Sequence, residues 1–335
     1  MGTQIRQFPH AGKPEPAPAP TVCWVVTDGK VGMETQCLGL AEALGFDPVV
    51  KRIRLRQPWR ALNPWLPIPG RRVFAAGSDA FVPPWPDVMI ATGRQSAGPA
   101  LYAKKRTGGR LFCVQIQDAG VAPHRFDLVV VPEHDRVRGD NVVTTLGALN
   151  RVTPDRLAAE AARWAPRLAR LPSPRLAVLI GGDNGAYRLT SGRMRDLADR
   201  LAALAHEGWG LMVTPSRRTG AANEALLRDA LAGVDAFVWD GTGDNPYFGF
   251  LGLADAIVVT ADSVNMVTEA AGTGRPVHVV DLDGGSPKFA AFHASMRAAG
   301  IARPFEGTIG RWDYPPLLET ARVAGIVRER LRARA

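Results

Sequence analysis

Apolar runs about as long as one β-strand alternate with helical patterns along most of the chain, and this alternation limits the fold more than any other feature. The clearest unit covers residues 257–280: an apolar run ends at Thr260, a polar turn reaches Ser263, a helical segment stops at Gly272, and a second apolar run begins at Val277. A helix between two strands brings the chain back to start the next strand in the same direction. Repetition of this unit therefore predicts an α/β protein with parallel sheets.

The alternation is interrupted at Leu171-Pro-Ser-Pro174 and starts again with the apolar run that begins at Leu176. A chain of 335 residues is long enough for two domains that each have a core. We therefore expect a domain boundary at this proline-rich stretch. The expected organisation is a disordered tail over 1–20, an N-terminal domain over 21–170, a C-terminal domain over 175–312, and a helix over 313–335 that packs back on the N-terminal domain.

Composition narrows the class of protein further. Hydrophobic residues make up 46% of the chain and charged residues 22%, which is typical of a globular protein, and the apolar runs are too short to span a bilayer. The three cysteines, Cys23, Cys37 and Cys113, do not have the spacing of a metal site. We therefore expect reduced thiols in the cytoplasm and no bound metal.

The net charge of +9 is explained by solubility alone or by attraction to phosphates, anionic lipid or nucleic acid. No zinc-finger spacing, aromatic RNA-binding signature or long basic run supports nucleic acid. Residues 51–86 combine seven basic residues with tryptophans at 59, 65 and 85, which suits the edge of an anionic membrane. A long ordered loop over the core explains the same segment equally well. The prediction is a cytoplasmic protein, with peripheral docking on the inner face of the cytoplasmic membrane as one of these two interpretations.

In the second half, polar residues follow the ends of predicted strands. The glycines after Ile180 suit a phosphate or a tightly packed domain seam, and the arginines after Thr214 suit a diphosphate clamp or a solvated loop. The helix that starts after Ser263 offers free N–H groups to an anion, and Glu269, about one and a half turns later, is placed to accept hydrogen bonds from a ribose. The predicted nucleotide site comprises Gly181, Gly182, Asn184, Ser216, Arg217, Arg218, Ser263, Asn265 and Glu269.

The first half shows the same arrangement of polar residues at strand ends. Because the carboxyl ends of parallel strands meet at one edge of a sheet, these residues are expected to form one wall of a cleft. Each segment taken alone is also consistent with a plain surface turn. The predicted second site comprises Lys30, Arg94, Gln117 and Asp118, with Asp28 or His134 as general base. Asp28 is preferred, since its glycine turn lies nearest the expected domain seam.

Taken together, these segments resemble the mitochondrial-fission "elongated mitochondria" family, whose many bacterial members are often labelled nucleoside-diphosphate-sugar epimerases. The resemblance runs in motif order from about Val22 to Pro316. Val31 and Thr35 depart from the alanine and asparagine that the family pattern leads one to expect. Four of the motifs that carry the resemblance are Thr27-Asp-Gly-Lys-Val-Gly32, Gln115-Ile-Gln-Asp118, Gly181-Gly-Asp-Asn-Gly185 and Thr260-Ala-Asp-Ser-Val-Asn-Met-Val-Thr-Glu269.

The same motif order more distantly resembles MurG, a GT-B glycosyltransferase that adds N-acetylglucosamine to a lipid-linked acceptor. Residues 86–93 resemble a strand and glycine turn of its acceptor domain, and residues 263–269 match its donor turn and ribose-binding glutamate. The Gly181–Gly182 loop matches its interdomain glycine loop. The first loop here has fewer glycines, and Gln117-Asp118 differs from the acceptor-side loop of that enzyme. The resemblance implies two Rossmann-like domains of GT-B type that face a cleft. The C-terminal domain would bind the nucleotide-sugar donor, and the N-terminal domain would bind the acceptor through the second site, to which the resemblance adds Gln36.

These resemblances imply more than one function. The first is a glycosyltransferase that moves a sugar from a nucleotide-sugar to an envelope or lipid-linked acceptor, without metal or cofactor if arginines and helix N-termini neutralise the leaving diphosphate. Plant members of the family are implied to recruit a dynamin-related protein, so a non-catalytic adaptor is the alternative. An epimerase is disfavoured, because the chain lacks a complete dinucleotide fingerprint and a Tyr-x-x-x-Lys pair. The basic, alanine- and proline-rich composition favours a bacterial member.

Overall fold

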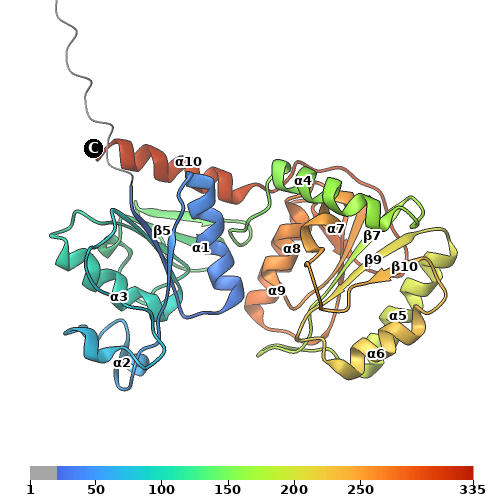
Figure 1. Cartoon of the computed structure of the whole chain (residues 1–335), viewed down its shortest axis with the longest axis horizontal. Helices are drawn as coiled ribbons and strands as arrows, with labels where there is room; N and C mark the ends of the chain where they lie inside the picture. Colours follow the sequence, from blue (N-terminus) through green and yellow to red (C-terminus); the bar gives the residue numbers. More distant parts are fainter. Residues whose placement is uncertain (1–20, 335) are drawn as a thin grey trace, which may run out of the picture.

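The structure is a computed structural model that describes residues 21–334, so the tail predicted over 1–20 lies outside the described residues. Two six-stranded sheets, in which every pair of neighbouring strands is parallel, form the centres of two domains that lie side by side (Figure 1). A small antiparallel pair joins β8 (Tyr187–Arg188) to β13 (Asp283–Gly284). This arrangement confirms the predicted α/β fold with two Rossmann-like domains.

The N-terminal sheet has the strand order β2-β1-β3-β4-β5-β6. The order reverses between β1 and β3, and open α/β sheets bind ligands at the carboxyl ends of strands beside such a reversal. The elements of this half are β1 (Cys23–Thr27), α1 (Val31–Leu44), β2 (Val49–Arg52), α2 (Trp59–Leu62), η1 (Arg71–Val73), β3 (Val88–Thr92), α3 (Gly93–Arg106), β4 (Phe112–Ile116), η2 (Pro123–Arg125), β5 (Leu128–Pro132) and β6 (Val142–Thr145).

The C-terminal sheet has the order β10-β9-β7-β11-β12-β14, with its reversal between β7 and β11. Its loops therefore meet at a second expected ligand position. The elements are α4 (Pro154–Trp164), η3 (Ala165–Leu168), β7 (Arg175–Ile180), α5 (Ser191–His206), β9 (Gly210–Pro215), α6 (Ala221–Ala230), β10 (Ala236–Val238), α7 (Tyr247–Leu253), β11 (Ala256–Thr260), α8 (Val264–Ala271), β12 (Val277–Val280), α9 (Pro287–Ala298), β14 (Ala302–Pro304) and α10 (Glu319–Arg332).

The core of each domain includes one helix whose residues lie, in the sequence, on the other side of the boundary expected at 171–174. Helix α4 precedes the proline-rich linker, yet it packs on α7, and Trp164 at its end is buried in the C-terminal core. Thr153 caps α4 by accepting a hydrogen bond from the Arg156 N–H, and Pro154 stands at the first helical position. Helix α10 follows the C-terminal sheet and returns to the N-terminal domain (Figure 1). The chain therefore crosses between the domains twice.

Helix α10 is part of the N-terminal core. Val323, Ala324 and Val327 are fully buried and belong to the same cluster as the inner residues of β1, β3, β4 and α1. Its arginines also secure it: Arg330 donates to the carbonyl oxygens of Asp127 at 2.9 Å and Asp140 at 3.0 Å. Apolar burial and arginine–carbonyl bonds thus fix α10 on this domain.

The segment over 51–86 is an ordered excursion, and most of its aromatic residues are used inside the domain. Phe81 packs edge-on against Trp24 of β1 and against Trp85, and the Trp85 ring is tilted against Trp24. By contrast, Leu62 and Trp65 at the end of α2 are exposed, Trp65 by 61%. No helix within residues 21–334 is both long and apolar enough to cross a membrane.

Candidate functional site

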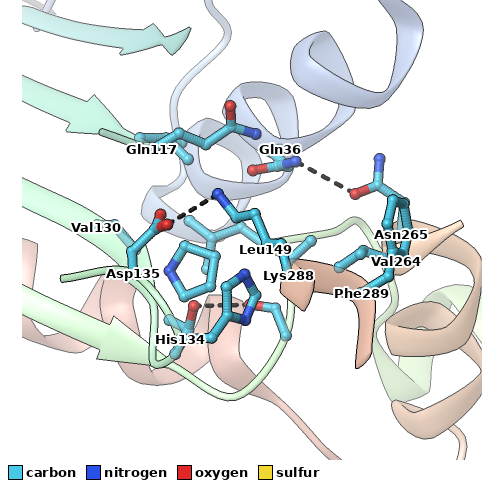
Figure 2. A pocket seen from close by; sticks show the side chains of 15 residues that line it. Gln36, Gln117, Val130, His134, Asp135, Leu149, Val264, Asn265, Lys288 and Phe289 are labelled. Carbon is cyan, nitrogen blue, oxygen red and sulfur yellow. Dashed lines mark hydrogen bonds and ion pairs between the residues drawn. The ribbon is translucent and has the colours of Figure 1, made fainter. Parts of the chain in front are cut away.

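A cavity of about 210 Å³ lies between the two domains, with walls from both (Figure 2). The N-terminal wall comes from α1 and from the loops after β4, β5 and β6, and the C-terminal wall comes from the starts of α8 and α9. Strand ends supply most of the loops because the carboxyl edges of both sheets face this seam. The polar and titratable residues that line the cavity are Gln36, Gln117, His134, Asp135, Thr145, Asn265 and Lys288.

His134 and Asp135 follow β5, and Lys288 stands at the start of α9 in the other domain. The Lys288 Nζ lies 2.8 Å from Asp135 Oδ1, so an ion pair joins the two walls. Asp135 Oδ2 is buried and has no hydrogen-bond partner among the described residues. Burial lowers the pKa of His134, the Lys288 charge lowers it further, and Asp135 and Glu133 oppose both effects. A neutral imidazole in this position is able to accept a proton near neutral pH.

Asn265 joins the domains through its amide group. Its Nδ2 donates to the Gly32 carbonyl oxygen at 3.0 Å, and its Oδ1 accepts from Gln36 Nε2 at 3.2 Å (Figure 2). A Cβ on Gly32 would collide with Asn265 Nδ2, so a larger residue at this position would have to displace the amide that joins α1 to α8. The structure thus places a predicted nucleotide residue, Asn265, in direct contact with a predicted acceptor residue, Gln36.

Gln117 lines the same cavity and has an unusual backbone. Its φ is +68°, a left-handed value that costs free energy for a residue other than glycine or asparagine. Strained residues of this kind gather at functional sites. The neighbouring Asp118 is exposed, and its carboxylate accepts the Gly120 N–H at 2.7 Å within its own loop.

Three other predicted residues of the N-terminal half lie outside the cavity. The Asp28 carboxylate pairs with Lys30 at 2.6 Å on the same turn. The Arg94 side chain donates to the carbonyl oxygens of Asn63 at 2.6 Å and Ala61 at 2.8 Å, and its guanidinium stacks on the Trp65 ring. Arg94 therefore holds the loop after α2 in place.

In the C-terminal domain, a buried carboxylate fills the space beside the glycine loop. Asp262 Oδ2 accepts the Gly182 N–H at 3.1 Å and pairs with Arg218 at 2.6 Å, and Asp262 Oδ1 accepts from the Thr260 hydroxyl at 2.6 Å. Thr260 Oγ1 in turn accepts the Gly181 N–H at 2.7 Å. The glycine-loop N–H groups and Arg218 are the predicted phosphate-binding groups. In the structure they already have partners, which are the side chains of Thr260 and Asp262.

The remaining loop residues of the predicted nucleotide site have mixed roles. Asn184 donates to the Asp262 carbonyl oxygen at 2.9 Å, and the Ser216 hydroxyl donates to the Gly181 carbonyl oxygen at 3.0 Å, so both brace the glycine loop. Ser263 caps α8 by accepting the Met266 N–H. Arg217 is exposed to solvent.

Glu269 is buried, with 7% of the residue exposed, and does not line the interdomain cavity. Its Oε2 accepts from the Tyr247 hydroxyl at 2.6 Å. Burial raises the pKa of Glu269 to about 7, although the Tyr247 hydrogen bond and the Arg151 charge lower it. A carboxylate buried at such an electrostatic cost is typical of functional positions.

Sequence reasoning missed Asp135, Tyr247, Asp262 and Lys288 as site residues. Asp135, Tyr247 and Asp262 lie inside or next to motifs that were recognised, so strand-end position was the signal that could have found them. Lys288 follows the helix start Ser286-Pro287 and had no such signal. Only the approach of the two domains brings Lys288 to Asp135.

Two doubly wound domains with a cavity at their seam define a GT-B architecture. A model of the family "Mitochondrial fission ELM1" matches residues 31–331, and the chain belongs to that family. The mitochondrial fission protein ELM1 of Arabidopsis thaliana is 28% identical over 92% of this chain and 91% of its own length. The uncharacterized protein RP120 of Rickettsia prowazekii (strain Madrid E) is 26% identical over 91% of this chain and 97% of its own.

Solved structures of sugar-nucleotide enzymes share the fold. The UDP-GlcNAc 2-epimerase of Methanocaldococcus jannaschii, in complex with UDP-GlcNAc and UDP, aligns with a TM-score of 0.52 at 11% identity, over 92% of this chain and 99% of that chain. MurG of Acinetobacter baumannii aligns with a TM-score of 0.49 at 16% identity, over 93% of this chain and 90% of that chain. At 11% identity, the likeness to the epimerase establishes the fold alone.

Proposed function

We propose that the chain binds a nucleotide-sugar at the crevice between its domains and transfers the sugar to an acceptor, as a metal-independent glycosyltransferase. The observation that carries this proposal is the interdomain cavity, which both His134 and the start of α8 line. That helix start and the Ser263 turn suit the diphosphate, because helix N-termini stabilise anions. Glu269, in the second turn of α8, is our candidate for the ribose hydroxyls. The fold is shared with a protein solved in complex with UDP-GlcNAc and UDP.

In the proposed reaction, an acceptor hydroxyl oxygen attacks the anomeric carbon of the sugar. The bond from that carbon to the diphosphate oxygen breaks, and the hydroxyl proton passes to a general base. We favour His134 as this base over Asp28, since His134 lines the cavity with a lowered pKa whereas Asp28 is paired with Lys30 outside it. Gln36 and Gln117 are the candidates for binding the acceptor. We propose that this acceptor is an envelope or lipid-linked molecule.

The test begins with calorimetric binding of a panel of nucleotide-sugars, followed by measurement of the nucleoside diphosphate released from the best ligand. Loss of a general base lowers a rate by roughly 100-fold or more. His134→Gln should therefore retain binding and lose turnover by about that factor, while the exposed His206→Gln should behave as the wild type. If the wild type binds no nucleotide-sugar, the proposal is wrong.

A non-catalytic adaptor on the same fold is the second candidate, and one observation favours it. Asp262 and Arg218 already neutralise each other beside the glycine loop, as expected where a phosphate site has been closed. An adaptor would bind nucleotide-sugars weakly or not at all and would release no nucleoside diphosphate from them. The turnover measurement therefore separates the two candidates.

An epimerase was disfavoured from the sequence for lack of a dinucleotide fingerprint and a Tyr-x-x-x-Lys pair. The absence of these two motifs no longer argues against an epimerase, because a protein named as a UDP-GlcNAc 2-epimerase shares this fold. Product analysis decides between the reactions: an epimerase returns a nucleotide-sugar with an inverted centre, whereas a transferase releases the nucleoside diphosphate.

Peripheral docking on an anionic membrane is our proposal for the surface at the end of α2. Leu62 and Trp65 are exposed there beside Arg60, and Arg71 and Arg72 are exposed on the same excursion. Sedimentation with anionic vesicles should fall as salt rises, because exposed charges are screened over about 10 Å at roughly 0.1 M. Leu62→Ser should weaken binding roughly tenfold by removing one inserted apolar side chain.

The matched control is Val49→Ser, which removes a similarly exposed apolar side chain on β2. Absence of vesicle binding at low salt, or equal losses of binding in the two variants, would contradict membrane docking by this surface.

A further inference from the structure

The ion pair between Lys288 and Asp135 is the only contact of opposite charges across the interdomain cavity among its described lining residues. Lys288 is the one lysine or arginine that lines the cavity, and Asp135 is the one carboxylate. Their atoms lie 2.8 Å apart, yet the Lys288 side chain is 61% exposed and that of Asp135 only 15%. The ammonium is thus free to move away, whereas the carboxylate is fixed in the wall.

The position of Lys288 is unfavourable for the helix that carries it. Ser286 caps α9 and Pro287 opens it, so Lys288 stands in its first turn. A cation there opposes the helix dipole, which favours anions at the N-terminus. Val264 and Asn265, at the start of α8, line the same wall. Two helix starts and one ammonium therefore direct positive potential into a single cavity, and Asp135 is the group that now neutralises it.

The arginines that the sequence predicts to bind the diphosphate are either already paired or outside the cavity. Arg218 is paired with Asp262, and the glycine-loop N–H groups bond to Thr260 and Asp262. Arg217 does not line the cavity. A diphosphate that enters at the start of α8 has Lys288 as its nearest unburied cation within that lining.

Building on the nucleotide-sugar site proposed above, we propose that Lys288 binds the diphosphate of a nucleoside diphosphate. In this proposal the diphosphate takes the place of Asp135 as the partner of Lys288. Binding then exchanges an ion pair between domains for a contact between ligand and Lys288. Released from Lys288, Asp135 remains beside His134. The positive charge that lowers the pKa of His134 is at the same time neutralised by phosphate, while Glu133 and Asp135 stay in place. Occupancy of the site and basicity of His134 are thereby linked.

The ion pair predicts opposite effects for its two members. Lys288→Met should weaken binding of the best nucleoside diphosphate by tenfold or more and leave binding of the matching nucleoside almost unchanged. Asp135→Asn should instead strengthen diphosphate binding about threefold to tenfold, because it removes the competing charge at constant volume. Calorimetric titration of UDP, ADP and GDP and their nucleosides into each variant measures both effects. Arg297→Met, which removes an exposed cation from the far end of α9, is the control and should bind as the wild type.

A pair that only fastens the domains together gives a different result, since both variants would then weaken binding alike. That outcome overturns the inference and leaves the proposed function standing, whereas failure of the wild type to bind any nucleoside diphosphate overturns both. A second readout is the proton NMR titration of His134. Its pKa should rise when the nucleoside diphosphate binds to the wild type and should change little in Lys288→Met. An equal rise in both proteins would also contradict the exchange.

Discussion

Replacement of Val327 by aspartate should unfold the N-terminal domain under conditions in which the wild type is fully folded. Val327 lies in α10, is completely buried, and packs in the cluster that includes Leu40 of α1 and Val25 of β1. Loss of a buried valine costs roughly 1.5–3 kcal/mol, and burial of a carboxyl without a partner adds a penalty of about the same size. The sum of about 3–6 kcal/mol approaches the total stability of an ordinary domain.

The comparison that makes this result specific is Ala321→Asp, which adds the same charge on the exposed side of α10. An acidic residue in the first turn of a helix is neutral or slightly stabilising, so the control should keep its unfolding midpoint. Denaturant unfolding followed by circular dichroism and by tryptophan fluorescence measures both variants. A small effect of Val327→Asp would mean that α10 is not part of the N-terminal core.

Replacement of Glu269 by glutamine should stabilise the protein at pH 8 while it weakens nucleotide binding. Burial raises the pKa of Glu269 from its usual value of 4.5 to about 7. A shift of about 2.5 units corresponds to roughly 3 kcal/mol, because each unit is worth about 1.4 kcal/mol. The amide of glutamine does not ionise, and its oxygen still accepts the Tyr247 hydrogen bond.

The sign follows from proton binding. Between pH 4.5 and about 7 the folded protein keeps a proton on Glu269 that the unfolded chain has lost. The stability of the wild type therefore falls as the pH rises through this window, and the full loss is reached above pH 7. Glu269→Gln should match the wild type near pH 4 and exceed it by roughly 3 kcal/mol at pH 8.

Binding should respond in the opposite direction. If the carboxylate accepts hydrogen bonds from the ribose, its replacement should cost roughly 1–3 kcal/mol of nucleotide affinity. Urea unfolding at pH 4 and pH 8 measures the stability, and calorimetry measures the affinity. Glu207→Gln, at an exposed carboxyl, is the control and should change neither. Unchanged nucleotide affinity in a folded Glu269→Gln protein would remove Glu269 from the nucleotide site.

Much of the fold was predictable because it depends on local patterns. The unit over 257–280 was recognised as strand, turn, helix and strand, and the structure has β11, α8 and β12 in those places with Ser263 as the cap. The α4 start at Thr153-Pro154 has the same kind of local signal. The order of the strands, with reversals beside β1 and β7, is not local and came only from the structure.

The candidate site was predictable as a set of strand-end loops, but the contacts within it were not. Gln36, Gln117, His134 and Asn265 were all singled out from the sequence, and they line one cavity. The sequence did not reveal that Arg218 is neutralised by Asp262, or that Arg94 serves the loop after α2. Charged side chains reach several ångströms in any direction, so the choice of partner depends on which backbones are brought together.

What the sequence by itself determined is the class of fold and the edge of each sheet at which ligands are expected. The periodicity of apolar residues, the helix caps and the glycine turns each depend on a few neighbouring residues. Together they define the helices and strands. The tertiary structure decided how the two domains face each other. That arrangement pairs Asn265 with Gln36 and Lys288 with Asp135, places Glu269 against Tyr247, and leaves Asp28 outside the cavity. Contacts between residues far apart in the chain form only when the domains pack, and no local pattern encodes them.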